Sequence, residues 1–126
     1  MSFKDKLKGL EGRKEIPVDV GDDVIFTLRE MNGNMRDYWD ADNQKRVKFK
    51  GRNPDLNTLR TEGSRALIVA MTLVDDDTKE LAFDYKDAEQ LKELGKLASG
   101  KMEKLVDAAY ELCGIRAEDA KDAEKN

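Results

Sequence analysis

Histidine is absent from this chain of 126 residues. The sequence therefore holds neither the Ser-His-Asp and Cys-His arrangements of nucleophilic catalysis nor imidazole ligands for a metal. Carboxylates and lysines remain as candidate catalytic groups, but nothing in the sequence places two carboxylates in a defined cleft. We therefore expect a protein that is not an enzyme and that uses no cofactor and no metal.

Cysteine is almost absent, since Cys113 is the only one. A single cysteine cannot form an internal disulfide, and its position on the apolar side of an expected helix is typical of an inert core residue. Long apolar runs are also missing. No N-terminal stretch resembles the apolar part of a signal peptide, and no run approaches the ~20 residues that span a bilayer. We expect a protein of the reducing cytoplasm without a membrane partner.

Charged residues, by contrast, make up 40% of the chain, well above the roughly 25% of an average soluble domain. The formal net charge is −4, which argues against nucleic acid as the main partner. A chain of this length forms one ordinary domain with a sizeable core. Self-association into a homo-oligomer remains open at this point.

The pattern of apolar residues predicts an α+β fold that is mostly α, with a short N-terminal β-hairpin packed on a bundle of about four helices. We expect a flexible basic arm over residues 1–14, in which Phe3, Leu7 and Leu10 suit either a frayed amphipathic turn or a disordered segment. A single globular domain is expected over 15–115 and a frayed, charged tail over 116–126. Period-two alternation of apolar residues over 15–30, broken by Gly21-Asp22-Asp23, predicts the hairpin and its turn.

The helices are expected after this hairpin. Asn34 is a candidate N-cap for a helix that ends around residues 45–47, and Asp84 or Asp87 is a candidate N-cap for a later one. The apolar run 66–74 suits either a buried helix or a buried strand. The stretch before this run has little β character, which favours the helix.

The octapeptide GKLASGKM, residues 95–102, comes within one residue of the phosphate-binding consensus G-x-x-x-x-G-K-[ST]. Met102 stands where a hydroxyl should hold Mg²⁺, a helical pattern replaces the preceding strand, and no second metal-binding element follows. We therefore expect a joint between two amphipathic helices, in which Ser99 caps the second helix and Gly100 eases the turn. That helix should end before Gly114, because glycine is typical just beyond a helix C-terminus.

The acidic run Asp75-Asp76-Asp77 raises the question of a calcium site. An EF-hand loop that started at Asp75 would need Gly at its sixth position and Glu at its twelfth, where this chain has Glu80 and Lys86. The match fails, and aspartates favour turns because their side chains bond nearby backbone N–H groups. We expect a turn.

Met31, Met35, Tyr38 and Trp39 follow one another at helical spacing and include the only tryptophan of the chain. One interpretation is an ordinary core stripe. The other is a partner-binding patch at the edge of the domain, where methionines and aromatics are favoured. Adjacent residues diverge by about 100° on a helix, so Tyr38 and Trp39 cannot both point squarely into one core.

A cluster of basic residues without any acid lies in the stretch KRVKFKGR, residues 45–52. Its members are Lys45, Arg46, Lys48, Lys50 and Arg52. The alternation within the stretch favours a short edge strand whose lysines discourage aggregation. The alternative is a patch that contacts the phosphates of a nucleic acid, with Phe49 as a stacking aromatic.

The order of these features resembles the tail assembly chaperones of long-tailed, siphovirus-type bacteriophages and prophages. The resemblance covers residues 15–115 and contains no catalytic motif. It is carried by LREM at 28–31, RDYW at 36–39, the apolar segment and acidic turn at 66–77, LAF at 81–83, and the closing helices at 91–94 and 105–114.

This resemblance implies a function and partners. Such chaperones bind the long tape measure protein while the tail tube polymerises around it, and they are absent from the finished virion. Many have a longer form, made by a −1 ribosomal frameshift, whose extension is thought to recruit the major tail tube protein. If Glu124-Lys125-Asn126 is encoded by GAA-AAA-AAC, these codons contain a slippery heptamer for such a shift. The gene sequence tests this hypothesis, because any other codon choice that breaks the heptamer excludes the site.

Three other functions remain open. A small structural tail or head–tail completion protein shares the size, charge and viral context. A nucleic-acid-associated phage regulator would use the basic residues of 45–52. A small enzyme acting through carboxylates is the least supported of the three.

Overall fold

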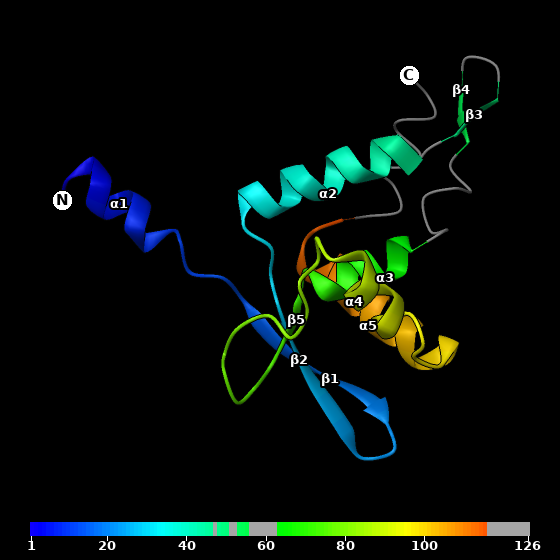
Figure 1. Ribbon diagram of the computed structural model, residues 1–126. Coiled ribbons are helices and arrows are strands. Elements are labelled where there is room, and N and C mark those ends of the chain that lie inside the picture. The colour runs from blue at the N-terminus through cyan, green and yellow to red at the C-terminus, as the bar shows by residue number, and fades with distance from the viewer. Residues whose placement is uncertain (47, 51–52, 56–62, 116–126) are drawn as a thin grey trace.

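The structure is a computed structural model that describes residues 1–46, 48–50, 53–55 and 63–115. A small sheet and a group of helices form the body of the molecule (Figure 1). In chain order the elements are α1 (Phe3–Gly9), β1 (Glu15–Gly21), β2 (Val24–Arg29), α2 (Gly33–Arg46), β3 (Lys48–Lys50), β4 (Asn53–Asp55), α3 (Ser64–Ala70), β5 (Leu73–Val74), α4 (Ala88–Leu94) and α5 (Ser99–Leu112). This arrangement confirms the predicted α+β fold, which is mostly α and has an N-terminal hairpin.

The hairpin β1–β2 has a two-residue turn. Asp22 and Asp23 both have positive φ angles, 56° and 60°, as a type I′ turn requires. Gly21, with a φ of 95°, follows an irregularity in β1, and its N–H donates to the Asp19 carboxylate (2.8 Å). The register that results from this turn places Val20 in the core.

The strand β2 lies between β1 and the short third strand β5. The Arg29 N–H donates to the Thr72 carbonyl (2.7 Å), so the N–H groups of Thr27 and Arg29 face β5 and not β1. Pro17 pairs with Thr27 and therefore occupies a position in β1 where the missing N–H removes no bond of the ladder. Among the described strands, none pairs with the outer side of β1.

The apolar run 66–74 contains both a helix and a strand. The helix α3 ends at Ala70, and β5 begins after a two-residue turn. The hydroxyl of Thr72 in this turn donates to the Ile68 carbonyl (2.9 Å). The preference for a helix is confirmed for the first part of the run and wrong for its end. Every residue of the run is buried. Its sequence therefore has no periodicity that would show where the helix ends and the strand begins.

Hydrogen bonds at the helix N-termini confirm one predicted cap and correct another. Asn32, and not Asn34, caps α2, because its Oδ1 accepts from the Met35 N–H (2.9 Å). Asp87, one of the two candidates, caps α4 by accepting from the Glu89 N–H (2.9 Å).

The octapeptide joins two helices, α4 and α5, as the sequence predicted, but Ser99 and Gly100 do not form the turn between them. The N-cap of α5 is Ala98, no side chain caps the helix, and Ser99 is its first residue. Gly100 lies inside the helix, where an added Cβ would meet no atom within 4 Å. The expected roles of Ser99 and Gly100 are therefore wrong. Beyond the other end of α5, Gly114 has a φ of 70°, as predicted for a residue that ends a helix.

The core of the body is one cluster centred on α3. This helix packs against α2, α4 and α5, and α5 also packs against β1. The buried apolar members of the cluster are Val20, Leu28, Met31, Met35, Trp39, Leu67, Ile68, Val69, Ala70, Met71, Leu73, Leu94, Met102, Leu105, Val106 and Ala109.

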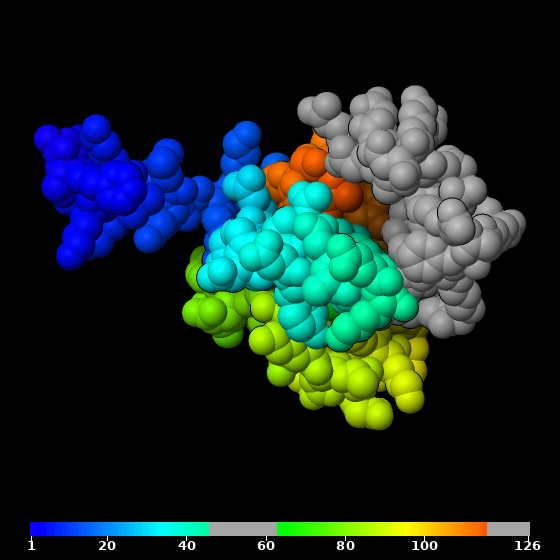
Figure 2. All heavy atoms as spheres, turned by 90° about the horizontal axis from the view of Figure 1, so that it is seen from above, coloured from blue at the N-terminus to red at the C-terminus, as the bar shows by residue number. Residues whose placement is uncertain are grey.

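The helix α1 stands apart from this core. Its first turn is capped by Ser2, whose hydroxyl accepts from the Asp5 N–H (3.2 Å), and none of its residues is buried. Figures 1 and 2 show α1, in dark blue, separated from the body by the chain segment that leads into β1. No helix within the described ranges is long and apolar enough to cross a membrane.

Candidate partner-binding surfaces

The four residues predicted as either a core stripe or a partner patch do not share one environment. Met31, Met35 and Trp39 are buried, and the Trp39 ring lies beside Tyr110 with 6.1 Å between the ring centroids. Tyr38 is 37% exposed. Three of the four are therefore core residues, and a partner-binding role for the four stays a prediction. The two adjacent aromatics diverge as helix geometry requires, and of the four only Tyr38 faces outward.

Tyr38 belongs to a small aromatic cluster at the surface. Its ring meets the Tyr85 ring edge to face, with 5.2 Å between the centroids. The Lys86 Nζ lies 5.5 Å from the Tyr38 centroid and 5.9 Å from the Tyr85 centroid. Cation–π contacts at exposed sites contribute about 0.5–1 kcal/mol each. The cluster thus connects α2 to the segment that precedes α4.

The most exposed large apolar side chains inside a helix or at its end belong to α1. Phe3, Leu7 and Leu10 are 74%, 49% and 82% exposed. Their spacing of four and three residues places them on one side of the helix. On a helix that turns about 100° per residue, Lys4 and Lys6 flank this side. We call Phe3, Leu7 and Leu10 the α1 face. The sequence predicted a frayed amphipathic turn or a disordered arm here, and the structure has a capped helix.

A second exposed surface is formed by residues 75–89, between β5 and the first turn of α4. This segment holds seven acidic and two basic residues, a formal net charge of −5. Its apolar residues Leu81, Phe83 and Tyr85 are half-buried against the core and alternate with exposed residues. We call residues 75–89 the acidic strip. It presents carboxylates around partly exposed apolar side chains.

The acidic strip starts with the turn that was predicted in place of a calcium site. The Asp75 carboxylate accepts from the Asp77 N–H (2.9 Å), and the Asp75 N–H donates to the Glu80 carbonyl (2.8 Å). Within the described residues, no group of three or more His, Cys, Asp or Glu side chains is placed to hold a metal ion. The side chains of Asp76, Asp77 and Glu80 are exposed.

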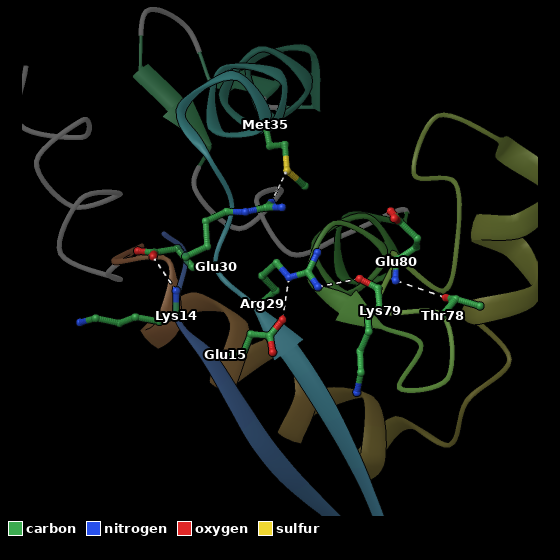
Figure 3. A network of polar contacts seen from close by, with 9 residues as sticks. Lys14, Glu15, Arg29, Glu30, Met35, Thr78, Lys79 and Glu80 are labelled. Atoms are coloured by element: carbon green, nitrogen blue, oxygen red, sulfur yellow. Dashed lines mark hydrogen bonds and ion pairs between the residues drawn. The ribbon is translucent and has the colours of Figure 1, made fainter. Parts of the chain in front are cut away.

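Arg29 connects the root of the N-terminal arm to the start of the acidic strip (Figure 3). Its Nε donates to the Glu15 carboxylate (2.7 Å), and its Nη2 donates to the Lys79 carbonyl (2.7 Å). Next to it, the Lys14 N–H donates to the Glu30 carboxylate (3.1 Å). These bonds hold the chain from Lys14 onward, so the root of the N-terminal arm and the start of the acidic strip share one anchored point.

Lys101, the octapeptide lysine that matches the consensus lysine, contacts the hairpin turn. The Lys101 Nζ donates to the Asp22 carboxylate. This hydrogen bond and the charge of Lys101 lower the pKa of Asp22 below its usual value. Lys101 thereby connects α5 to the turn between β1 and β2.

We expect Lys101→Ala to change how the stability of the protein depends on pH. The folded-state pKa of Asp22 is lowered, so its contribution is present above the unfolded-state pKa and is lost as the pH falls through the folded-state value. Urea unfolding should show a small loss of stability in Lys101→Ala at neutral pH that disappears in acid. Asp22→Asn is the matched control, because asparagine tolerates a positive φ. A loss that is the same at every pH would exclude this ion pair as its cause.

Four other residues of the octapeptide line an open cleft of about 510 Å³ between α3 and the start of α5. Gly95, Leu97, Ser99 and Met102 contribute to its wall. The ion pair between Arg65 and Glu103 lies in the same wall. Lys101 does not line this cleft, so the cleft lacks the lysine that the phosphate-binding consensus would supply.

The predicted basic cluster is only partly described. Lys45 and Arg46 end α2, and Lys48 and Lys50 lie in β3, which pairs with β4. The predicted short strand is therefore confirmed. Arg52 lies outside the described residues. Contact of these residues with a nucleic acid stays a prediction.

Cys113 is half-buried directly after α5 and packs against the core. Burial raises the pKa of its thiol. A raised pKa keeps the thiol protonated at neutral pH and therefore poorly nucleophilic. This environment fits the structural role expected from the sequence.

Within the described residues, the α1 face and the acidic strip are thus two exposed surfaces that combine apolar side chains with charge. Comparison of this chain with protein-family models, curated proteins and solved structures found no match.

Proposed function

We propose that this protein is a tail assembly chaperone of a long-tailed bacteriophage or prophage. It would bind the tape measure protein in the cytoplasm of the bacterial host and keep it soluble while the tail tube polymerises. The order of sequence features over residues 15–115 supports this proposal. The observation that carries it is the α1 face, an amphipathic surface that no described part of the chain covers.

The chemistry of the α1 face suits a long helical client with exposed apolar sides. Burying a Leu or Phe side chain fully contributes about 1.5–3 kcal/mol. Three such residues give a weak contact once the cost of ordering both partners is subtracted. Many copies bound along one client would then cover it through contacts that exchange readily. Lys4 and Lys6, beside the face, favour client helices with acidic flanks.

Release of the client would follow from the weakness of these contacts. Subunits of the major tail tube protein would replace the chaperone by competition for the tape measure protein, without a nucleotide cycle or a cofactor. The high content of charged residues, 40% of the chain, would keep the complex between chaperone and client soluble until that exchange.

Removing the α1 face should abolish the chaperone effect. We expect the variant Phe3→Ser/Leu7→Ser/Leu10→Ser to lose the apolar contact with the client while its own unfolding midpoint stays nearly unchanged, because these side chains lie outside the core. The proposal expects the tape measure gene, a very long helical reading frame, directly downstream of this gene, and the test is co-expression with the product of that frame. The soluble fraction of that protein should fall to the level seen without the chaperone.

The control variant is Val24→Ser/Ile25→Ser, which removes two exposed apolar side chains from the hairpin and leaves the arm intact. It should keep the client soluble. A triple variant that works as well as wild type would show that the client binds elsewhere. If the wild-type protein itself has no effect on the client and is found in purified mature particles, it is a structural tail or head–tail completion protein instead.

A further inference from the structure

We infer that, in the absence of a client, the α1 face docks on the acidic strip of a second copy of this chain. This inference rests on the proposed function in one point only, namely that the α1 face also binds the client. The association itself requires no other protein.

Charge complementarity identifies the second copy as the occupant. Residues 1–14 hold five basic and two acidic residues, a formal charge of +3. Because the whole chain carries −4, all the other residues together carry −7. The acidic strip alone has a formal charge of −5. The acidic strip therefore carries most of the net negative charge that this protein can offer to the basic arm.

The apolar side chains of the two surfaces are also complementary. Phe3 and Leu7 project from one side of α1, and Lys4 and Lys6 lie on either side of them. On the acidic strip, half-buried Leu81, Phe83 and Tyr85 alternate with exposed positions, and the exposed carboxylates of Asp76, Asp77 and Glu80 lie at its start. Docking thus covers apolar surface on both sides and pairs lysines with carboxylates at the rim.

The geometry favours exchange between two copies over folding back on the same chain. Arg29 and Glu30 hold the chain at Lys14 and Glu15, and from this point α1 points away from the body in both views (Figures 1 and 2). Arg29 also anchors the start of the acidic strip through the Lys79 carbonyl. The root of the arm and the start of the acidic strip are therefore neighbours. In a dimer with a twofold axis, each arm would contact the acidic strip of the other copy, so the same contact would form twice.

This association should be weak and sensitive to salt. Each arm offers only three large apolar side chains, Phe3, Leu7 and Leu10, and small interfaces are typically transient. Its charged pairs lie at the rim, where salt screens them effectively. We therefore expect dimers that form with rising protein concentration and dissociate with rising salt.

The test is sedimentation of the full chain over a range of concentrations, with two charge-reversed variants. One carries Lys4→Glu, Lys6→Glu and Lys8→Glu in the arm, and the other carries Asp76→Lys, Asp77→Lys and Glu80→Lys in the acidic strip. Each variant alone should stay monomeric at concentrations at which wild type dimerises. An equimolar mixture of the two should dimerise again, because each arm then meets a strip of opposite charge.

Two results would overturn the inference. The first is a wild-type protein that stays monomeric at all concentrations in low salt. The second is a dimer that persists in both reversed variants, or that the mixture fails to restore. The strip variant keeps the α1 face, so it should still hold a client soluble although it no longer dimerises. If wild type dimerises as expected but neither protein protects the client, only the chaperone proposal fails.

Discussion

Trp39→Ala should lower the free energy of unfolding by about 3–5 kcal/mol, as large-to-small substitutions of buried aromatics do. Trp39 is only 3% exposed and lies beside Tyr110 inside the core. Small domains are stable by roughly 5–15 kcal/mol, so the variant should be close to unfolding at moderate temperature. The measurement is denaturant unfolding followed by far-ultraviolet circular dichroism, because the only tryptophan is lost.

Tyr38→Ala is the matched control from the neighbouring position. Its ring contacts Tyr85 and Lys86 at the surface, so the loss should be about 1 kcal/mol, the scale of aromatic and cation–π contacts. Two small and equal losses would contradict the core position of Trp39. Such a result would instead support Trp39 as part of a partner-binding patch.

Leu105→Ala should cost about 2–5 kcal/mol, the range for removing a buried leucine. Leu105 is fully buried in the middle of α5, the helix that packs against both α3 and β1. The cavity would therefore weaken the contact between the helices and the hairpin at once. The urea midpoint should fall without a change in the slope of the transition.

Leu112→Ala, near the end of the same helix, gives the comparison for this second variant. Leu112 is half-buried at the edge of the cluster, where water replaces the lost side chain and no closed cavity forms. The cost should be clearly smaller than for Leu105→Ala. Equal costs would mean that the body is not organised around the middle of α5.

The hairpin was predictable because its signals are local. The alternation of Ile16, Val18 and Val20 and the turn at Asp22-Asp23 act within one short segment. The strand β5 was not predictable in the same way. It follows α3 inside one apolar run, and its identity as a strand depends on pairing with β2, which lies far away in the sequence.

The candidate surfaces were predictable only in part. The sequence showed that Tyr38 and Trp39 diverge, but the choice of the inner residue depends on Tyr110 and Tyr85, which come from other segments. For the α1 face, the sequence left an amphipathic turn and a disordered arm open, because three apolar residues among many charges suit either. The acidic strip was recognised as a turn at Asp75, while its apolar members appear at the surface only once the fold is known.

Pro17 has a consequence for how this protein meets other chains. An extended peptide that tried to lengthen the sheet along the outer side of β1 would find no N–H group at Pro17, so strand addition would lose a bond at the centre of the edge. If many copies of this protein assemble on one client, as proposed, Pro17 would protect them against edge-to-edge growth of the sheet. Recognition is left to helix faces and side chains, the mode in which amphipathic helices bind apolar surfaces.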